Sequence, residues 1–215
     1  MFNKIMSDKK EGIIVILSSP SGAGKTSLVK EISSKNNFSI SVSHTTRKPR
    51  SNEIDGSDYF FVKEEEFKEL IYNKKFLEYA KVFNNYYGSS KDVIFKKLDN
   101  GENVIFDIDW QGTEQIKQKN LKYKIITIFI LPPSREELFN RLLNRDLNDE
   151  NNAKERMKQF DKDVMHWKNY DLVVINDNFN KCYNNIMKYI NLGTKNITEI
   201  YNKADIENHV LALLK

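Results

Sequence analysis

The chain has 215 residues, of which 40% are hydrophobic and 30% charged, proportions typical of a compact globular protein. One cysteine, Cys182, and only 8 glycines and 4 prolines exclude a disulfide scaffold and a low-complexity chain. The net charge of +4 comes from scattered lysines rather than one basic arm, so nucleic acid is not expected as a partner. No apolar run reaches the roughly 18 residues that span a bilayer, and none resembles a secretory signal, so we expect a cytoplasmic protein without membrane contact.

The first elements of the chain are a strand, a loop and a helix. An apolar run at residues 12–18 precedes a cluster of Gly, Ser and Pro, and apolar residues at helical spacing follow it. Residues 38–43 alternate, and residues 59–62 and 76–87 are rich in Phe and Tyr. These segments indicate a small inserted lobe. Three more runs rich in β-branched residues predict buried parallel strands, at residues 104–110, 124–131 and 171–175.

Helices are expected between and after these strands. Ser134 with Glu137 three residues later forms a capping-box pattern, and apolar spacing over residues 153–167 predicts the next helix. The polar residues 144–154 between them predict a mobile loop. The last residues predict an amphipathic helix whose apolar positions are Ile206, Val210, Leu211 and Leu214.

The strongest chemical signal is the stretch SPSGAGKT at residues 19–26, which follows the first strand and opens the first helix. Small residues let backbone N–H groups converge on phosphate oxygens, and the helix N-terminus adds partial positive charge. Lys25 is expected to reach the β- and γ-phosphates of ATP, and Thr26 to ligate Mg²⁺. The general P-loop pattern has Gly where this chain has Ser19. The expected ATP-binding residues are Ser19, Pro20, Ser21, Gly22, Ala23, Gly24, Lys25 and Thr26.

A P-loop alone does not separate hydrolases, switches and kinases, and the inserted lobe supplies the distinction. Residues 45–62, TTRKPRSNEIDGSDYFFV, contain two arginines, an acid, a glycine and a Tyr-x-Phe. In this stretch the sequence resembles the guanylate kinase family, whose signature has these residue types at this spacing. The resemblance runs to about Ile190 and continues through FLEYA, NYYGS, IFDIDWQG, PPS and VIND, at residues 76–80, 85–89, 105–112, 132–134 and 174–177.

The residues of the lobe suit a nucleoside monophosphate. Its phosphate carries close to two negative charges, which bidentate arginines match better than lysines do. Arg47, Arg50, Tyr59 and Tyr87 are the expected phosphate clamp, and the resemblance adds Ser89 to the GMP-binding residues.

Guanine presents one acceptor, O6, beside two donors, N1–H and the N2 amine, so a buried carboxylate is its natural partner. The resemblance implies that Glu78 takes the two donors, Ser43 donates to O6 and Asp109 contacts the N2 amine. Adenine lacks the N1 donor and would leave Glu78 unpaired, which disfavours AMP.

Other charged residues are candidates for the metal and for a lid. Asp107 lies two residues from Asp109 on an expected strand, so both side chains share a face, and Asp107 is a candidate for Mg²⁺ through water. Arg145 and Arg156 are the expected lid arginines, with Arg141 next, because phosphoryl transfer needs cations that arrive with lid closure. Asn176 is the candidate for the adenine edge. A structural role is expected for His44 and Cys182.

Together these features predict an α/β protein with a P-loop three-layer α/β/α core, a parallel sheet, an inserted mixed α/β lobe that binds GMP, and a helical lid. The expected core is residues 1–43, 97–143 and 165–215, the insert 44–96, and the lid 144–164. The expected reaction is ATP-dependent phosphorylation of GMP, with dGMP as a second acceptor, catalysed by Lys25, Arg47, Arg145 and Arg156. The alternatives are a kinase for another nucleoside monophosphate and a related protein-interaction module that has lost catalysis.

Overall fold

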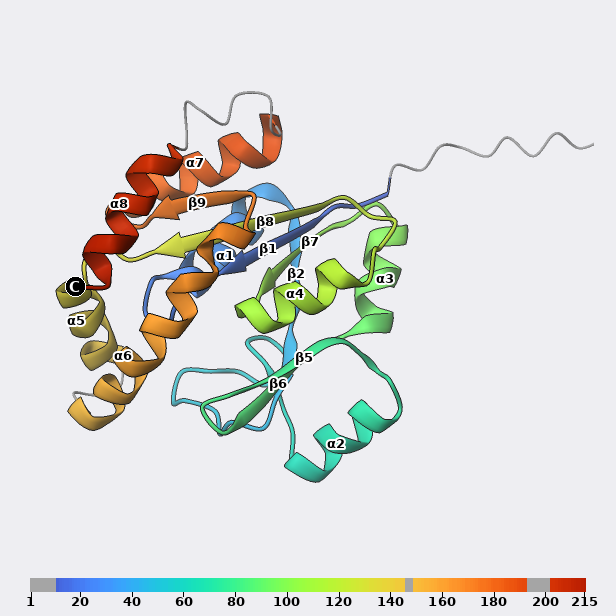
Figure 1. Ribbon diagram of the computed structural model, residues 1–215. Coiled ribbons are helices and arrows are strands. Elements are labelled where there is room, and N and C mark those ends of the chain that lie inside the picture. Colours follow the sequence, from blue (N-terminus) through green and yellow to red (C-terminus); the bar gives the residue numbers. More distant parts are fainter. Residues whose placement is uncertain (1–10, 146–148, 193–201) are drawn as a thin grey trace, which may run out of the picture. The chain divides into compact units, whose positions relative to one another are not determined.

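The computed structural model describes residues 11–145, 149–192 and 202–215 (Figure 1). The chain forms two compact units. Of the described residues, the first unit contains 11–15, 36–106 and 111–125, and the second contains 16–35, 107–110, 126–145, 149–192 and 202–215. The limits of the core, insert and lid expected from the sequence remain a prediction.

A five-stranded sheet has the strand order β2-β7-β1-β8-β9. Strand β2 pairs parallel with β7, and β8 pairs parallel with β9, so the predicted α/β fold with a parallel sheet is confirmed. All five residues of β1 are buried, which is why this strand is a continuous apolar run rather than an alternating one. The strands are β1 (Ile14–Ser18), β2 (Phe38–Ile40), β7 (Asn103–Asp107), β8 (Ile125–Leu131) and β9 (Leu172–Ile175).

A second sheet, mixed and four-stranded, lies within the first unit and has the order β4-β3-β6-β5. Strand β6 is antiparallel to β3 and β5, whereas β4 runs parallel to β3. Phe67 of helix α2 is fully buried, and its ring lies 4.6 Å from that of Phe76 and 5.4 Å from that of Tyr86. The elements are β3 (Ser43–Thr45), β4 (Phe60–Phe61), β5 (Phe76–Val82), β6 (Asn85–Ser90), α2 (Glu64–Tyr72) and α3 (Lys91–Asp99).

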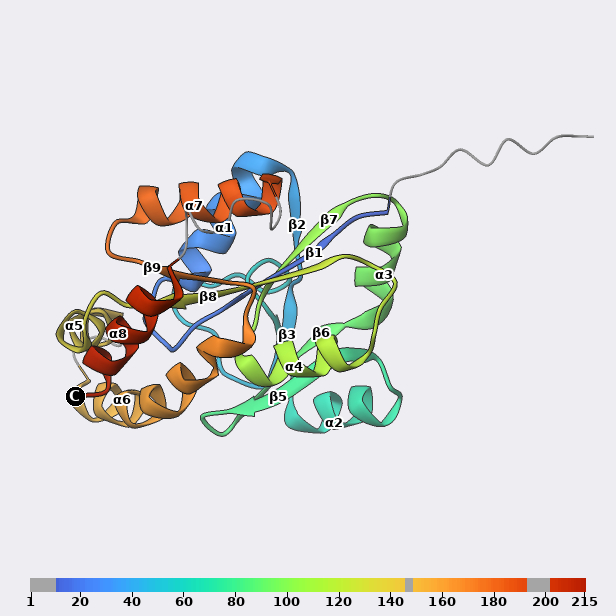
Figure 2. The same cartoon turned by 45° about the horizontal axis from the view of Figure 1, so that its top comes forward.

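The remaining helices include α4 (Trp110–Gln118), whose first residue belongs to the second unit. Helices α5, α6 and α8 of the second unit share one apolar cluster that includes Leu138, Phe160 and Val210, and they lie side by side in Figures 1 and 2. In the described parts of the second unit, the helices other than α4 are α1 (Lys25–Asn36), α5 (Arg135–Arg145), α6 (Glu150–Val164), η1 (Met165–Asn169, a 3-10 helix), α7 (Phe179–Leu192) and α8 (Lys203–Leu213).

The predicted start of α5 is confirmed in part. The backbone N–H of Glu137 donates to Ser134 Oγ at 3.1 Å, as a capping box requires. The Glu137 carboxylate does not return to Ser134 but accepts from Arg141 Nε at 2.9 Å.

Three sequence-based expectations need correction. The strand expected over residues 104–110 ends at Asp107, and Trp110 begins α4, so the argument that Asp107 and Asp109 share a strand face is wrong. The polar segment 144–154 is not one mobile loop, because α5 continues to Arg145 and Asp149 caps α6 through the Asn152 N–H; residues 146–148 lie outside the described residues.

The third correction concerns α8, which forms as expected and buries two of the four apolar positions expected from the sequence, but not the other two. Ile206, Val210 and Leu213 are buried, whereas Leu211 is 54% exposed and Leu214 37% exposed. Ile206, Val210 and Leu213 have the spacing i, i+4 and i+7, which places them on one side of the helix, whereas Leu211 lies off that side and Leu214 follows the last helical residue. Of the helices in the described parts of the chain, none is long and apolar enough to cross a membrane.

Candidate active site

The predicted phosphate loop lies where the sequence placed it, between the end of β1 at Ser18 and the start of α1 at Lys25. Gly22 has φ +89° and Gly24 has φ +98°, a backbone region that side chains rarely adopt. A Cβ atom on Gly24 would lie 2.3 Å from Asn176 Nδ2, and one on Gly22 would lie 2.9 Å from Leu138 Cδ1. Glycine is therefore required at both positions.

Asn176 holds the phosphate loop by a side-chain hydrogen bond. Its side-chain amide donates to the Ala23 carbonyl at 2.8 Å, its backbone N–H donates to Leu131, and it is only 6% exposed. Arg141 Nη2 donates to the Asn176 carbonyl at 3.3 Å. The proposed contact of Asn176 with adenine remains a prediction, since in this structure its amide nitrogen holds the loop.

Lys25 and Thr26 converge on the end of β7. Lys25 Nζ lies 2.5 Å from Asp107 Oδ1, and the Thr26 hydroxyl donates to Asp107 Oδ2 at 2.6 Å. The carbonyl of Ile108 accepts from Lys25 Nζ and from Ser18 Oγ, both at 3.0 Å. The structure thus brings together the three side chains for which roles at the γ-phosphate and at Mg²⁺ were predicted.

The two predicted lid arginines meet at one residue of the phosphate loop. Arg145, at the end of α5, donates through Nη2 to Ser21 Oγ at 3.0 Å, and Arg156 of α6 donates through Nη1 to the same oxygen at 2.9 Å. Two cations from different helices therefore meet at Ser21, a residue of the loop that is predicted to bind the phosphates of ATP. Arg141 points instead to Glu137 and Asn176.

In the first unit, the two predicted phosphate-binding arginines are held by one carboxylate. Glu53 Oε1 accepts from Arg47 Nη2 at 2.8 Å and from Arg50 Nη1 at 3.1 Å, and Oε2 accepts from the Arg50 backbone N–H at 2.8 Å. Burial alone would raise the pKa of Glu53, but these hydrogen bonds and the two positive charges hold it below its ordinary value. The pKa of Arg47 is raised, because its contacts with Glu53 and Tyr87 outweigh its burial.

Sequence reasoning did not assign Glu53 a role, although its carboxylate fixes both arginines. The signal that could have found it is its spacing: Glu53 lies three residues after Arg50 and six after Arg47, close enough to pair with both across one turn.

The two predicted tyrosines lie beside the same arginines. The rings of Tyr59 and Tyr87 are 6.0 Å apart at 67°, and the Arg47 guanidinium lies 5.4 Å from the Tyr59 ring centre. Arg47 also lies 5.8 Å from the ring of Phe61. The rings of Tyr59 and Phe61 limit the positions that the Arg47 guanidinium can adopt. A guanidinium held in this way can donate its N–H groups to a phosphate.

Glu78, Ser89 and Ser43 form a buried polar chain across three strands. Ser89 Oγ donates to Glu78 Oε1 at 2.6 Å and lies 3.2 Å from Ser43 Oγ. Glu78 is 3% exposed, Ser43 5% and Ser89 0%. A register shift between Phe76 and Glu78 in β5 aligns Glu78 with Ser89 of β6.

The buried carboxylate and Tyr87, one residue of the predicted phosphate clamp, share one face of this sheet. Ser43 pairs with Ser89 and Thr45 with Tyr87 in the β3–β6 register, so Ser89 and Tyr87 are two residues apart on β6. Side chains two residues apart point to the same face, about 7 Å from each other. One sheet face thus carries a carboxylate suited to guanine N–H donors and, two residues along β6, Tyr87, which interacts with Arg47. Asp109 belongs to the other unit, and its contact with guanine remains a prediction.

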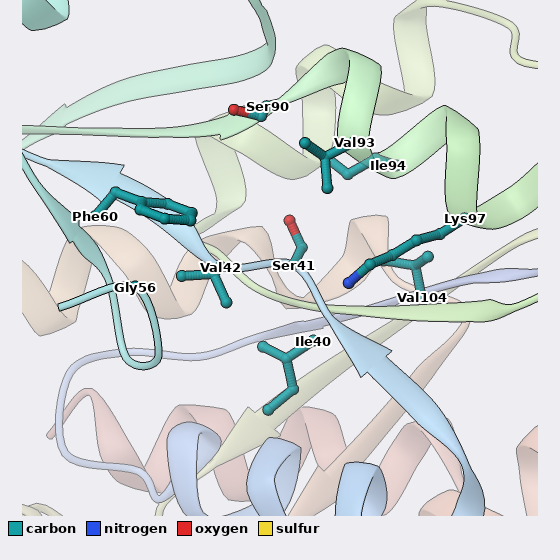
Figure 3. Close-up of a pocket in the computed structure, with 10 residues that line it drawn as sticks. All are labelled: Ile40, Ser41, Val42, Gly56, Phe60, Ser90, Val93, Ile94, Lys97 and Val104. Atoms are coloured by element: carbon teal, nitrogen blue, oxygen red, sulfur yellow. The ribbon is translucent and has the colours of Figure 1, made fainter. Parts of the chain in front are cut away.

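Of the two residues expected to be structural, Cys182 is buried and His44 is half-buried. Burial raises the pKa of the Cys182 thiol to about 12 and lowers the pKa of His44, whose ring stacks on Phe60 at 4.8 Å. A cavity of about 210 Å³ in the first unit (Figure 3) is lined mainly by apolar side chains, with Ser41, Ser90 and Lys97. The side chains predicted to bind nucleotide are not among its lining residues.

A phosphate loop with Lys25 and Thr26 on Asp107, two arginines on Ser21 and a separate sheet with an arginine clamp define the class of P-loop nucleoside monophosphate kinases. The guanylate kinase family model matches residues 11–192. Guanylate kinases from Rickettsia prowazekii and Wolbachia pipientis are 50% and 45% identical, each over 86% of this chain and over 93% and 92% of the respective relative.

Among solved structures, a crystal structure of guanylate kinase from Anaplasma phagocytophilum has a TM-score of 0.69 at 31% identity, covering 89% of this chain and 94% of that one. The chain therefore belongs to the guanylate kinase family, whose activity is phosphoryl transfer from ATP to GMP. This confirms the resemblance found in the sequence and the predicted activity, and it does not favour the protein-interaction module.

Proposed function

We propose that GMP binds on the mixed sheet of the first unit, that ATP binds on the phosphate loop, and that the named side chains carry out the transfer that gives GDP and ADP. The single observation that carries this assignment is the buried Glu78–Ser89–Ser43 chain on the same sheet face as Tyr87. It places a carboxylate suited to guanine two strand residues from Tyr87, which interacts with Arg47.

The base specificity follows from hydrogen-bond chemistry. The Glu78 carboxylate can accept about four hydrogen bonds, and one of its donors is Ser89. A carboxylate of this kind suits guanine N1–H and the N2 amine, while a hydroxyl at Ser43 suits O6. We propose dGMP as a second acceptor, because none of these contacts with the base involves the ribose.

The proposed donor site rests on three kinds of group. Backbone N–H groups of residues 19–26 and Lys25 bind the phosphates of ATP. Thr26 and Asp107 supply hard oxygen atoms that fit Mg²⁺, which characteristically binds one or two protein oxygens together with phosphates. When bound, the ion neutralises charge on the β- and γ-phosphates. The Lys25 ammonium is held by Asp107 and Ile108 until a phosphate replaces them.

No general base is needed in this proposal. A GMP phosphate oxygen is largely ionised at neutral pH and can attack the γ-phosphorus directly, so the protein contributes position and positive charge. Lys25, Arg47, Arg145 and Arg156 are the proposed charge-stabilising residues. Arg145 and Arg156, now on Ser21, are proposed to turn to the transferring phosphoryl group. Because both substrates are intracellular nucleotides, the proposed site of action is the cytoplasm, in purine nucleotide metabolism.

Lys25→Met tests the donor assignment. Losing one preorganised cation at the transferring phosphate should lower kcat at least about 100-fold, measured as ADP release in a coupled assay. GMP affinity in calorimetric titration should be unchanged, because Lys25 contacts neither Glu78 nor Arg47. Lys30→Met, an exposed position on the same helix, is the matched control and should keep the full rate. A Lys25→Met variant with most of its activity would contradict the assignment.

A further inference from the structure

A second, half-buried carboxylate lies on α6, the helix of the expected lid, and has no proposed nucleotide contact of its own. Asp163 Oδ1, in the last turn of α6, accepts from Trp110 Nε1 at 3.2 Å and from Gln159 Nε2 at 2.8 Å. The indole of Trp110 also stacks on His166, with ring centres 3.6 Å apart and planes at 8°. Burial, aided by the charge of Asp109, raises the pKa of Asp163. The surroundings of this carboxyl group therefore disfavour its charged form.

Trp110 is the last residue of a short segment, residues 107–110, whose other end holds the phosphate loop. Asp107 binds Lys25 and Thr26, and the Ile108 carbonyl accepts from Lys25 and Ser18. One four-residue segment is therefore fixed at one end by the phosphate loop and at the other by the base of the lid helix.

Asp163 and Arg156 lie seven residues apart on α6, which is two turns and about 10.5 Å along the axis. Residues at this spacing share one helix face. From this face Asp163 reaches Trp110 and Arg156 reaches Ser21 of the phosphate loop at 2.9 Å. One face of α6 thus carries the Trp110 contact near its C-terminal end and, two turns earlier, the arginine with a proposed role in transfer, while Phe160 and Val164 pack in the apolar cluster.

We propose that Asp163 is a positioning residue for phosphoryl transfer: its hydrogen bond to Trp110 fixes the base of the lid helix so that Arg156 is presented to the phosphate loop. This inference rests on the proposed role of Arg156. Asp163 is not itself among the residues with a proposed nucleotide contact. Trp110 provides the donor and, through its stack on His166, a rigid surface for the turn that follows the helix.

The geometry sets the expected size of the effect. A helix that tilts by about 10° at Asp163 displaces Arg156 by about 1.8 Å over the two turns between them. Misplacing a catalytic group by about 1 Å can cost on the order of 100-fold in rate. Asp163→Ala should therefore lower kcat about 10- to 100-fold and leave the KM values for ATP and GMP within about threefold, the pattern of an interaction that acts in the transition state.

The experiment is a double-mutant cycle in the full-length chain. Variants Asp163→Ala, Arg156→Ala and the double variant are compared by steady-state kinetics and thermal melting, with Glu155→Ala, a solvent-exposed carboxylate on the same helix, as the matched control. If Asp163 acts through Arg156, the double variant should be no more than about threefold slower than Arg156→Ala alone. Asp163→Asn, whose amide oxygen can still accept from Trp110, should recover most of the rate.

Two results overturn the proposal: a kcat for Asp163→Ala within about threefold of the parent, or rate losses that multiply in the double variant. Should Asp163→Ala fail to fold, Trp110→Phe provides the same test, since it removes the N–H donor and keeps a ring for His166. It should be slower than the parent, again without further loss in the Arg156→Ala background, and a full rate contradicts the proposal. A full rate in Arg156→Ala alone instead refutes the proposed role of that arginine, and the inference with it.

Discussion

Replacing Glu78 by Gln separates guanine recognition from folding. Glu78 is 3% exposed and accepts from Ser89 at 2.6 Å. In the proposed complex its carboxylate also accepts from guanine N1–H and the N2 amine, and hydrogen bonds to a charged group contribute about 1.5–3 kcal/mol each. Glutamine keeps one acceptor oxygen and turns an NH₂ group toward a donor. A loss of about 3–4 kcal/mol is expected, which raises the GMP dissociation constant on the order of 100- to 1000-fold.

Stability should respond in the opposite direction. A buried carboxylate without its ligand is costly, and a neutral amide of the same shape removes that cost. Glu78→Gln should therefore melt at or above the parent temperature while GMP binding is nearly lost and ATP binding is kept. Glu66→Gln, on the exposed surface of α2 in the same unit, is the control and should change neither.

A substrate analogue sharpens this test. Inosine monophosphate lacks the N2 amine, so it should be used about 10- to 100-fold less efficiently than GMP by the parent, through one missing hydrogen bond. In Glu78→Gln this preference should fall toward unity. The measurement is kcat/KM for both acceptors at saturating ATP. An unchanged GMP preference in the variant, or equal loss of ATP and GMP binding, would refute the assignment of Glu78 to guanine.

Two further changes test the phosphate loop and the arginine clamp. Gly24→Ala should weaken ATP binding and lower the melting temperature by several degrees, because its Cβ would lie 2.3 Å from Asn176 Nδ2 at φ +98°; if melting and ATP titration match the parent, the described loop geometry is wrong. Glu53, whose pKa lies below its ordinary 4.5 in the folded chain, stabilises the fold above that pH and loses this contribution as pH falls through its folded pKa. Melting from pH 7 to pH 3 should thus show the parent more stable than Glu53→Gln by about 1–3 kcal/mol at neutral pH, with the gap closing below about pH 4.5, and a constant gap would show that Glu53 does not hold Arg47 and Arg50.

Local patterns in the sequence identified the parts of the fold that depend on neighbouring residues. The buried strand before residues 19–26 and the helix after them follow from an apolar run, small residues and helical spacing. The same reasoning carried the strand at Val104 too far, because Ile108 continues the apolar pattern although the strand ends at Asp107. The polar composition of residues 144–154 led us to expect a loop where α6 in fact begins at Glu150. The residue that indicates this start is Asp149, which caps the helix.

The tertiary contacts of the site could not be derived in this way. Nothing in the spacing of Arg145 and Arg156 shows that both reach Ser21, since that depends on how α5 and α6 pack. The contact between Trp110 and Asp163 joins residues 53 positions apart and has no local pattern. Leu213 rather than Leu214 faces the core because the buried face of α8 is set by the cluster on which it packs.

Acceptor selectivity tests the central claim most directly. ADP release by the purified chain should be measured at saturating ATP and Mg²⁺ with GMP, dGMP, AMP, CMP and UMP in turn. We predict efficient turnover with GMP and dGMP, and kcat/KM for AMP lower by at least about 100-fold, because adenine leaves the buried Glu78 without its donors. Turnover of AMP equal to that of GMP, or no ADP release with any acceptor, would contradict the account.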